Sequence, residues 1–381
     1  MRTPVSALVT PPCAQQVLVP HEALVGFVAA VFERLGLAPQ RAAVAADALC
    51  YGDLTGMDSH GVANLTRLYL PLFREGRADP AADLEIVGDR AATVRVDAHR
   101  ALGLWAAAEA MDLAVERAAA FGVGVVSVFD GTHFGCAGYH AGRAAAHDMV
   151  GIVASNCGGQ RIARPPFGRV TMLGTNPLSI AAPGADDRPY VLDMSTTVVP
   201  TGRIRAAARA GRPVPEGWLV DDSGAPVTDP AAFDRGEAHI PWLGNRPETG
   251  SYKGYGLSLM VEVLAAVASG AACGPSPEAL GGDGRPSGRD DDIGYFVMAF
   301  APGTLRDVDA FRTDAATMFG SLLACPTTAP DARVRYPGWV EAERAERRRR
   351  FGVPLAASLY EELREVAHEL GLTAPEVGGL A

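Results

Sequence analysis

The stretch 122–143 constrains the fold more than any other part of the chain. An apolar, β-branched run stops at Phe129-Asp130-Gly131, a short polar turn then presents His133, and small residues open the next segment. This order predicts a strand, a turn and a helix, with an imidazole at the carboxyl end of the strand. Ligands of open α/β sheets bind at this edge, where helix N-termini supply N–H groups. His133 is therefore a candidate proton donor or acceptor, although a turn histidine that only caps the helix would give the same pattern.

The second unusual feature is the use of lysine. The chain has 34 basic side chains, and Lys253 is the only lysine among them. A lysine that persists in an arginine-rich chain indicates a site that suits a compact ammonium better than a planar guanidinium. Gly250 and Gly254 lie close to it in sequence and permit close approach of the backbone. These features favour a binding site, and the alternative is the chance survival of one codon.

The composition is that of an ordinary globular protein, with 381 residues of which 48% are hydrophobic and 20% charged. A net charge of −10 without a basic stripe argues against a nucleic-acid partner. The six cysteines contain no C-x-x-C pair, so we expect no metal site, no disulfide framework and a reducing, cytoplasmic compartment. The first 19 residues lack the apolar core of a signal peptide. The longest apolar stretch contains Glu262 and predicts a buried helix, not a membrane span.

Hydrophobic periodicity divides the chain into three parts. A flexible arm over 1–19 is predicted to precede helices that reach residue 80, with Asp58 or Ser59 as the N-cap of the third helix. The middle part alternates strands and helices, beginning with two strands around a Gly88-Asp89 turn. The last part returns to helix. We therefore predict one helical domain formed by residues 1–80 and 305–381, and an α/β region over residues 81–304.

Known sequence motifs restrict the chemistry mainly by their absence. The dinucleotide fingerprint G-x-G-x-x-G is missing, because neither Gly122-Val-Gly124 nor Gly282-Asp-Gly284 has the third glycine. The chain also has no Walker loop, no H-E-x-x-H and no G-x-S-x-G. The residues alone thus support an enzyme that uses histidine for acid/base chemistry, and they identify no cofactor.

Five stretches, in order, resemble the malate/L-lactate dehydrogenase family of nicotinamide-dependent oxidoreductases, which lacks the Rossmann fold. They are Asp58-Ser-His-Gly61, Thr132-His-Phe-Gly135, Leu173-Gly-Thr-Asn-Pro177, Asp193-Met-Ser-Thr-Thr197 and Lys253-Gly-Tyr-Gly256. The family includes ureidoglycolate and sulfolactate dehydrogenases, diketogulonate reductase and piperideine-2-carboxylate reductase. The resemblance implies an α/β fold with a non-Rossmann mixed-sheet NAD(P)-binding domain and a helical domain formed by both termini. It also implies NADH or NADPH as cofactor, a small-molecule substrate and a homodimer.

The resemblance implies roles for individual residues. His133 matches the catalytic acid/base, and Ser59 and His60 match positions that line the substrate pocket. Seven residues match cofactor-contacting positions, namely Cys157, Asp193, Met194, Ser195, Lys253, Pro337 and Gly338. Hydride transfer needs a proton donor beside the developing alkoxide, and a histidine with a pKa of ~6.5 serves both directions. His60 is the competing candidate because a helix N-terminus would disfavour its charged form; we expect His133 to move the proton and His60 to orient the substrate.

One position departs from the family pattern. The family commonly reads Ser-His-Gly-x-x-Arg, in which the arginine is expected to hold the substrate carboxylate, and here that position is Asn64. Either Arg67, one helical turn further on, takes over the carboxylate, or the substrate has a neutral, hydrogen-bonding group at that end. Three functions stay open: a dehydrogenase of 2-oxo and 2-hydroxy acids or of a related ketone with a modified carboxylate end, a cyclic-imine reductase, and a non-enzymatic nucleotide-binding relative. The presence of both His133 and Lys253 argues against the last of these.

Overall fold

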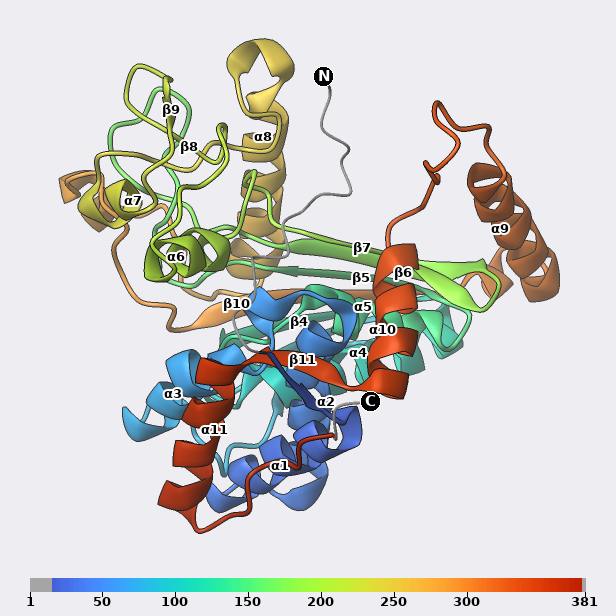
Figure 1. The fold of residues 1–381 in the computed structure, drawn as a ribbon. Helices are drawn as coiled ribbons and strands as arrows, with labels where there is room; N and C mark the ends of the chain where they lie inside the picture. The colour runs from blue at the N-terminus through green and yellow to red at the C-terminus, as the bar shows by residue number, and fades with distance from the viewer. Residues whose placement is uncertain (1–15, 379–381) are drawn as a thin grey trace.

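Apolar and β-branched segments build a seven-stranded sheet at the centre of the computed structural model, which describes residues 16–378 (Figure 1). Its strands are β2 Glu85–Arg90, β3 Thr93–Asp97, β4 Val123–Gly131, β5 Val150–Ser155, β6 Leu178–Ala185, β7 Arg188–Met194 and β10 Ile293–Phe300. The strand order is β2-β3-β4-β10-β5-β6-β7, in which β3 and β4 are parallel and the other neighbours are antiparallel. The predicted α/β fold with a mixed sheet is therefore confirmed.

The central strands are apolar on both faces, so helices cover both. Along β10, Val297 belongs to the hydrophobic core shared with α4 Gly103–Phe121 and α5 Ala137–Ala145. Its neighbour Phe296 packs instead with residues of α8 Ser251–Val261 and of the π-helical turn that continues it. Successive side chains of a strand point to opposite faces, which explains this division.

Described segments from the first and last parts of the chain lie together on the side of the molecule that carries the first two helices (Figure 1). Helices α1 His21–Arg34 and α2 Pro39–Thr55 pack together, and α11 Ala357–Leu370 contacts α1. The strands β1 Gln16–Val19 and β11 Val353–Ala356 pair in antiparallel fashion. The prediction of a flexible arm is therefore wrong for residues 16–19, because a partner strand from the other end of the chain orders them. Residues 1–15 of that arm lie outside the described residues.

Of the remaining helices, two belong to a small lobe, and two pack on strands β6 and β7 of the main sheet. A small lobe with its own apolar core contains α6 Thr201–Arg209, α7 Ala231–Arg235 and the hairpin of β8 Leu219–Val220 and β9 Pro226–Val227. Helix α10 Trp339–Phe351 contacts α2 and β7, whereas α9 Val308–Leu323 packs on β6 (Figure 1). The predicted division at residues 80 and 305 stays a proposal. No helix within residues 16–378 is both long and apolar enough to cross a membrane.

Two local predictions were wrong. The third helix does not start at Asp58 or Ser59, because Met57 precedes a 3-10 turn over Asp58–His60 and no side chain caps it. The helix that follows contains a π-turn, Leu65–Tyr69, before α3 Leu70–Arg74. The residues Gly88 and Asp89 lie within β2, paired with β3, so the turn between these strands falls at residues 91–92. Both differences arise where backbone pairing or packing overrides a local turn signal.

Candidate active site

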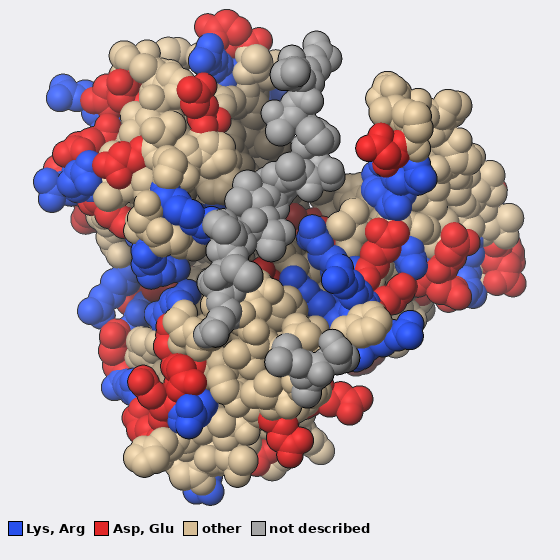
Figure 2. All heavy atoms as spheres, in the orientation of Figure 1, with Lys and Arg blue, Asp and Glu red and all other residues tan. Residues whose placement is uncertain are grey.

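A cavity of about 1800 Å³ lies between α6, the segment that follows α2, and α10. Six residues predicted as site residues line it: Ser59, His60, Asn64, Arg67, His133 and Cys157. The other six, Asp193, Met194, Ser195, Lys253, Pro337 and Gly338, are not part of this lining. Basic side chains gather toward α6 and toward α10 in Figure 2, and arginines of both helices line the cavity.

The turn that carries His133 is held by several buried contacts. The Thr132 hydroxyl accepts the Gly103 N–H (2.9 Å) and donates to the Ala101 carbonyl (3.1 Å). The Tyr295 hydroxyl donates to the Thr132 carbonyl. A Cβ at Gly103 would lie 2.2 Å from that same carbonyl oxygen, so only glycine lets α4 begin against the turn. These contacts fix the backbone of the residue before His133.

The His133 ring is oriented by two donors on one side. The Gly135 N–H donates to Nδ1 (3.1 Å), and the Tyr69 hydroxyl lies 2.9 Å from the same nitrogen. Because a backbone N–H can only donate, the neutral ring carries its hydrogen on Nε2. Nε2 has no hydrogen-bond partner among residues 16–378. Burial lowers the pKa of His133 below its ordinary value of 6.5, and the Asp290 carboxylate opposes part of this shift.

His60 faces His133 across the cavity. The two rings are stacked, with centroids 5.9 Å apart and planes inclined by 26°. Ser59 Oγ lies 2.9 Å from His60 Nδ1. Burial lowers the pKa of His60 to about 4, and the charges of His133 and Arg203 add to this effect. The expected direction of the shift is therefore correct, but burial is its main cause, and His60 ends a 3-10 turn, not the start of a helix.

The two residues considered for the substrate carboxylate both have other partners. Asn64 Nδ2 donates to the Ser59 carbonyl (3.1 Å), which braces the 3-10 turn. Arg67 Nη2 lies 3.5 Å from Glu362 Oε1 on α11, and both side chains are partly exposed. Both residues line the cavity. Neither of them presents an unpaired cation to the two histidines.

The stretches predicted to bind cofactor are connected by backbone hydrogen bonds. The Thr196 N–H donates to the Thr175 carbonyl (3.0 Å), and Thr175 lines the cavity. The Leu243 N–H donates to the Thr196 carbonyl (3.0 Å), and its own carbonyl accepts the Gly254 N–H (3.2 Å). This series of contacts links the cavity to the residue next to Lys253. Lys253 itself is exposed, and no carboxylate lies within 4 Å of its Nζ among residues 16–378.

The remaining predicted cofactor positions lie along β7. Asp193 Oδ2 accepts the Gly138 N–H (2.7 Å) at the start of α5, the helix that follows the His133 turn. Burial raises the pKa of Asp193 to about 6. The Pro337 carbonyl accepts the Val191 N–H (3.0 Å), which holds the Pro337-Gly338 turn against the same strand. The structure thus places six of the predicted residues in the cavity, Lys253 on α8, and the other predicted cofactor residues on β7 or next to it.

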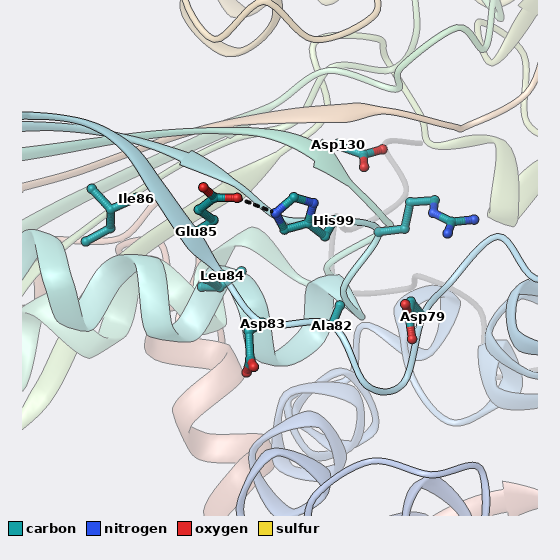
Figure 3. Close-up of a pocket in the computed structure, with 9 residues that line it drawn as sticks. Asp79, Ala82, Asp83, Leu84, Glu85, Ile86, His99 and Asp130 are labelled. Atoms are coloured by element: carbon teal, nitrogen blue, oxygen red, sulfur yellow. Dashed lines mark hydrogen bonds and ion pairs between the residues drawn. The ribbon is translucent and has the colours of Figure 1, made fainter.

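A second pocket, of about 940 Å³, lies at the loops beside β2 and β3 (Figure 3). It is lined by Asp79, Ala82, Asp83, Leu84, Glu85, Ile86, His99, Arg100 and Asp130. His99 Nε2 lies 2.9 Å from Glu85 Oε2, and this contact raises the pKa of His99. The pocket contains none of the predicted site residues. It is therefore not a candidate for the chemistry outlined above.

Sequence reasoning missed three side chains that shape the main site. They are Tyr69, which contacts His133, Asp53, which holds the backbone after His60, and Arg203, which lines the cavity beside His60. Tyr69 falls in the π-turn. The extra residue of that turn breaks the 3.6-residue spacing by which the buried face of a helix is recognised in a sequence. Arg203 and Asp53 carry no local signal that separates them from other helical arginines and aspartates.

Comparison with known proteins gives a consistent result. Residues 19–364 match the family described as malate/L-lactate dehydrogenase. The chain is 30% identical to malate dehydrogenase of Pyrococcus abyssi over 95% of its length and 97% of that protein. It is 33% identical to L-sulfolactate dehydrogenase of Methanocaldococcus jannaschii, covering 90% of this chain and 94% of that one. The crystal structure of malate dehydrogenase from Entamoeba histolytica superimposes with a TM-score of 0.86 at 29% identity, covering 95% of this chain and 100% of that one.

Proposed function

The chain belongs to the malate/L-lactate dehydrogenase family of NAD(P)-dependent 2-hydroxyacid dehydrogenases, and we propose that it interconverts a small 2-oxo acid and its 2-hydroxy acid. In this proposal His133 is the proton donor and acceptor. The observation that carries this proposal is the orientation of His133. Its Nδ1 is engaged by Tyr69 and Gly135, which leaves Nε2 for a substrate in the cavity.

The acid/base properties of His133 suit this reaction. A bound nicotinamide would exchange a hydride with the carbonyl carbon of the substrate. In reduction, the protonated ring gives the Nε2 proton to the developing alkoxide and keeps its second hydrogen on Nδ1, and oxidation reverses this transfer. When Nδ1 carries a hydrogen, the Tyr69 hydroxyl accepts it and the Gly135 N–H no longer bonds to the ring; when the hydrogen of the neutral ring lies on Nε2, the same hydroxyl donates to Nδ1. A lowered pKa makes the protonated ring a stronger acid and keeps the ring neutral down to a lower pH.

The described residues suit a dinucleotide. Its pyrophosphate is an anion, and Lys253 offers an ammonium without a carboxylate partner within residues 16–378. Thr175 and Cys157 line the cavity together with His133. We propose that Lys253 binds the phosphate or ribose part of the cofactor and that Asp193, Met194, Ser195, Pro337 and Gly338 contact it. A homodimer and a cytoplasmic location also stay proposals, supported by the family resemblance and by the scattered cysteines respectively.

A substrate screen tests the proposed reaction. The protein is mixed with NADH or NADPH and a panel of 2-oxo acids and cyclic imines, and oxidation of the nucleotide is followed by absorbance. We expect turnover with at least one 2-oxo acid. Turnover with cyclic imines alone would instead support the reductase on the same scaffold. Failure of every 2-oxo acid and every imine with both nucleotides would contradict both functions.

Lys253 provides a separate test of cofactor binding. Replacing Lys253 with alanine removes a charge-assisted contact of about 1.5–3 kcal/mol, so the KM for the nucleotide should rise about tenfold or more while kcat changes little. Lys253→Arg should also raise this KM, since a planar guanidinium does not fit a site built for an ammonium. Arg312→Ala, at an exposed surface pair on α9, is the matched control. An unchanged KM for the nucleotide in both Lys253 variants would mean that this lysine survives by chance and does not bind the cofactor.

A further inference from the structure

The cavity holds an unpaired cation that neither Asn64 nor Arg67 supplies. Asn64 braces the 3-10 turn, and Arg67 lies against Glu362. Arg203, in the first turn of α6, lines the same cavity as His60 and His133. Within residues 16–378, no carboxylate oxygen lies within 4 Å of its guanidinium.

The backbone of α6 brings Arg203 to the histidines. Its neighbour Gly202 packs against Ser59: a Cβ added at Gly202 would lie 3.4 Å from the Ser59 Cβ, which is van der Waals contact. Ser59 in turn contacts the His60 ring. Arg203 and His60 line the same cavity, and the Arg203 charge contributes to the lowered pKa of His60.

Arg205 differs from Arg203 in having a carboxylate partner. It stands two residues further along the same helix and also lines the cavity. Its Nη2 lies 3.1 Å from Asp234 Oδ1, so its charge is already paired within the small lobe. The two arginines therefore share an element, a charge and a cavity, but Arg205 is paired with Asp234 and Arg203 has no carboxylate partner within residues 16–378.

The rest of the cavity adds a field of the same sign. Among the described residues, its lining contains eight arginines and two aspartates, Asp58 and Asp290. The arginines are Arg67, Arg203, Arg205, Arg209, Arg212, Arg344, Arg347 and Arg348. A cavity lined by one sign of charge concentrates ligands of the opposite sign. This field favours an anionic substrate over one with a neutral end.

We propose that Arg203 binds the carboxylate of the substrate and so takes the role that the family arginine would have at position 64. A guanidinium holds a carboxylate through two parallel hydrogen bonds, which orients the 2-oxo group as well as binding it. The inference rests on the proposed function and specifies its substrate as a 2-oxo acid with a free carboxylate. It replaces both earlier alternatives, Arg67 as the clamp and a neutral group facing Asn64.

The test compares Arg203→Ala with Arg312→Ala, a control at an exposed surface pair outside the cavity lining. Two readouts are used: the KM for the 2-oxo acid that the screen identifies and for its amide, and the Kd of oxalate by calorimetry with the nucleotide present. In Arg203→Ala, the KM for the acid and the Kd of oxalate should rise about 10- to 100-fold, while the KM for the amide should change little. Arg312→Ala should change none of these values more than about threefold. Equal losses for the acid and the amide, or no change in either, would overturn the inference.

Two further variants make the test sharper. Arg203→Lys keeps the charge without the paired hydrogen bonds, so its oxalate affinity should lie between those of the parent and Arg203→Ala. Adding Asn64→Arg to Arg203→Ala should restore part of the affinity, because both positions line the same cavity. If the parent protein reduces no 2-oxo acid but its oxalate binding still depends on Arg203, the proposed reaction fails and the anion site stands. If the parent binds no oxalate, the anion site itself is wrong.

Discussion

Replacing His133 with alanine is expected to lower kcat by ~10²- to 10⁴-fold, the usual contribution of a positioned acid/base group. The KM for the nucleotide should stay nearly unchanged, because the residues proposed to bind the cofactor lie along β7 and on α8. The exposed His147, in the turn that follows α5, provides the matched control, and His147→Ala should keep the activity of the parent. If His133→Ala retains kcat within a few-fold of the parent, the proton must come from another group, and His60 becomes the first candidate.

The pH profile of the parent enzyme gives an independent test of His133. Reduction needs the protonated ring, so its kcat/KM should rise as the pH falls toward a pKa below 6.5. Oxidation needs the neutral ring, so its kcat/KM should hold at high pH and fall as the pH drops through the same range. Tyr69→Phe removes the hydroxyl 2.9 Å from Nδ1, which among residues 16–378 is the one contact of that nitrogen able to accept a hydrogen from the charged ring. The apparent pKa in this variant should move further down, with a smaller loss of kcat than in His133→Ala.

The parts of the site that the sequence predicted correctly have local signals. The strand, turn and helix around His133 follow from a β-branched run, an Asp-Gly pair and a run of small residues, all within about 20 residues. The gathering of Ser59, His60, Asn64 and Cys157 in one cavity could be expected from the family resemblance but not from composition or periodicity.

The parts that could not be predicted depend on contacts between distant segments. Strand β1 is ordered by β11 at the opposite end of the chain, and nothing in residues 16–19 identifies that partner. Arg203 becomes a candidate ligand only because Gly202 packs on Ser59, a contact between the small lobe and the helical side of the molecule. In such cases the side chain has an ordinary local sequence, and its role is set by the packing that surrounds it.

Asp53 is another residue whose role is set by its surroundings. It is a buried carboxylate on α2, and its Oδ2 accepts the Val62 N–H (2.6 Å) two residues after His60. A Cβ at Gly61 would lie 2.4 Å from this carboxylate, so the glycine permits the close contact. Burial raises the pKa of Asp53 from 3.8 to about 7, although the Val62 N–H lowers it and Asp58 raises it further. The backbone that carries His60 is therefore held by an acid that the fold keeps in part protonated near neutral pH.

This raised pKa predicts how stability depends on pH. The folded state binds the Asp53 proton more tightly than the unfolded state, so its contribution is fully present below pH 3.8 and is lost as the pH rises through about 7. Between pH 8 and pH 5 the contribution grows by about 3 kcal/mol. His60 acts with the opposite sign, because its pKa falls to about 4 and its contribution is lost as the pH drops below 6.5. The two effects overlap, so the Asp53 contribution must be measured as a difference between proteins.

Asp53→Asn isolates that contribution, because it removes the titration and keeps an oxygen able to accept the Val62 N–H. The free energy of unfolding is measured with denaturant at several pH values for the parent and the variant, and the histidine contributions cancel in the difference. The parent should gain about 3 kcal/mol relative to Asp53→Asn between pH 8 and pH 5. Asp47→Asn, an exposed position on the same helix, should give a difference that is nearly constant with pH. A constant difference for Asp53→Asn as well would mean that the carboxylate is charged in the folded protein throughout this range, and that Val62 and Arg348 together outweigh its burial.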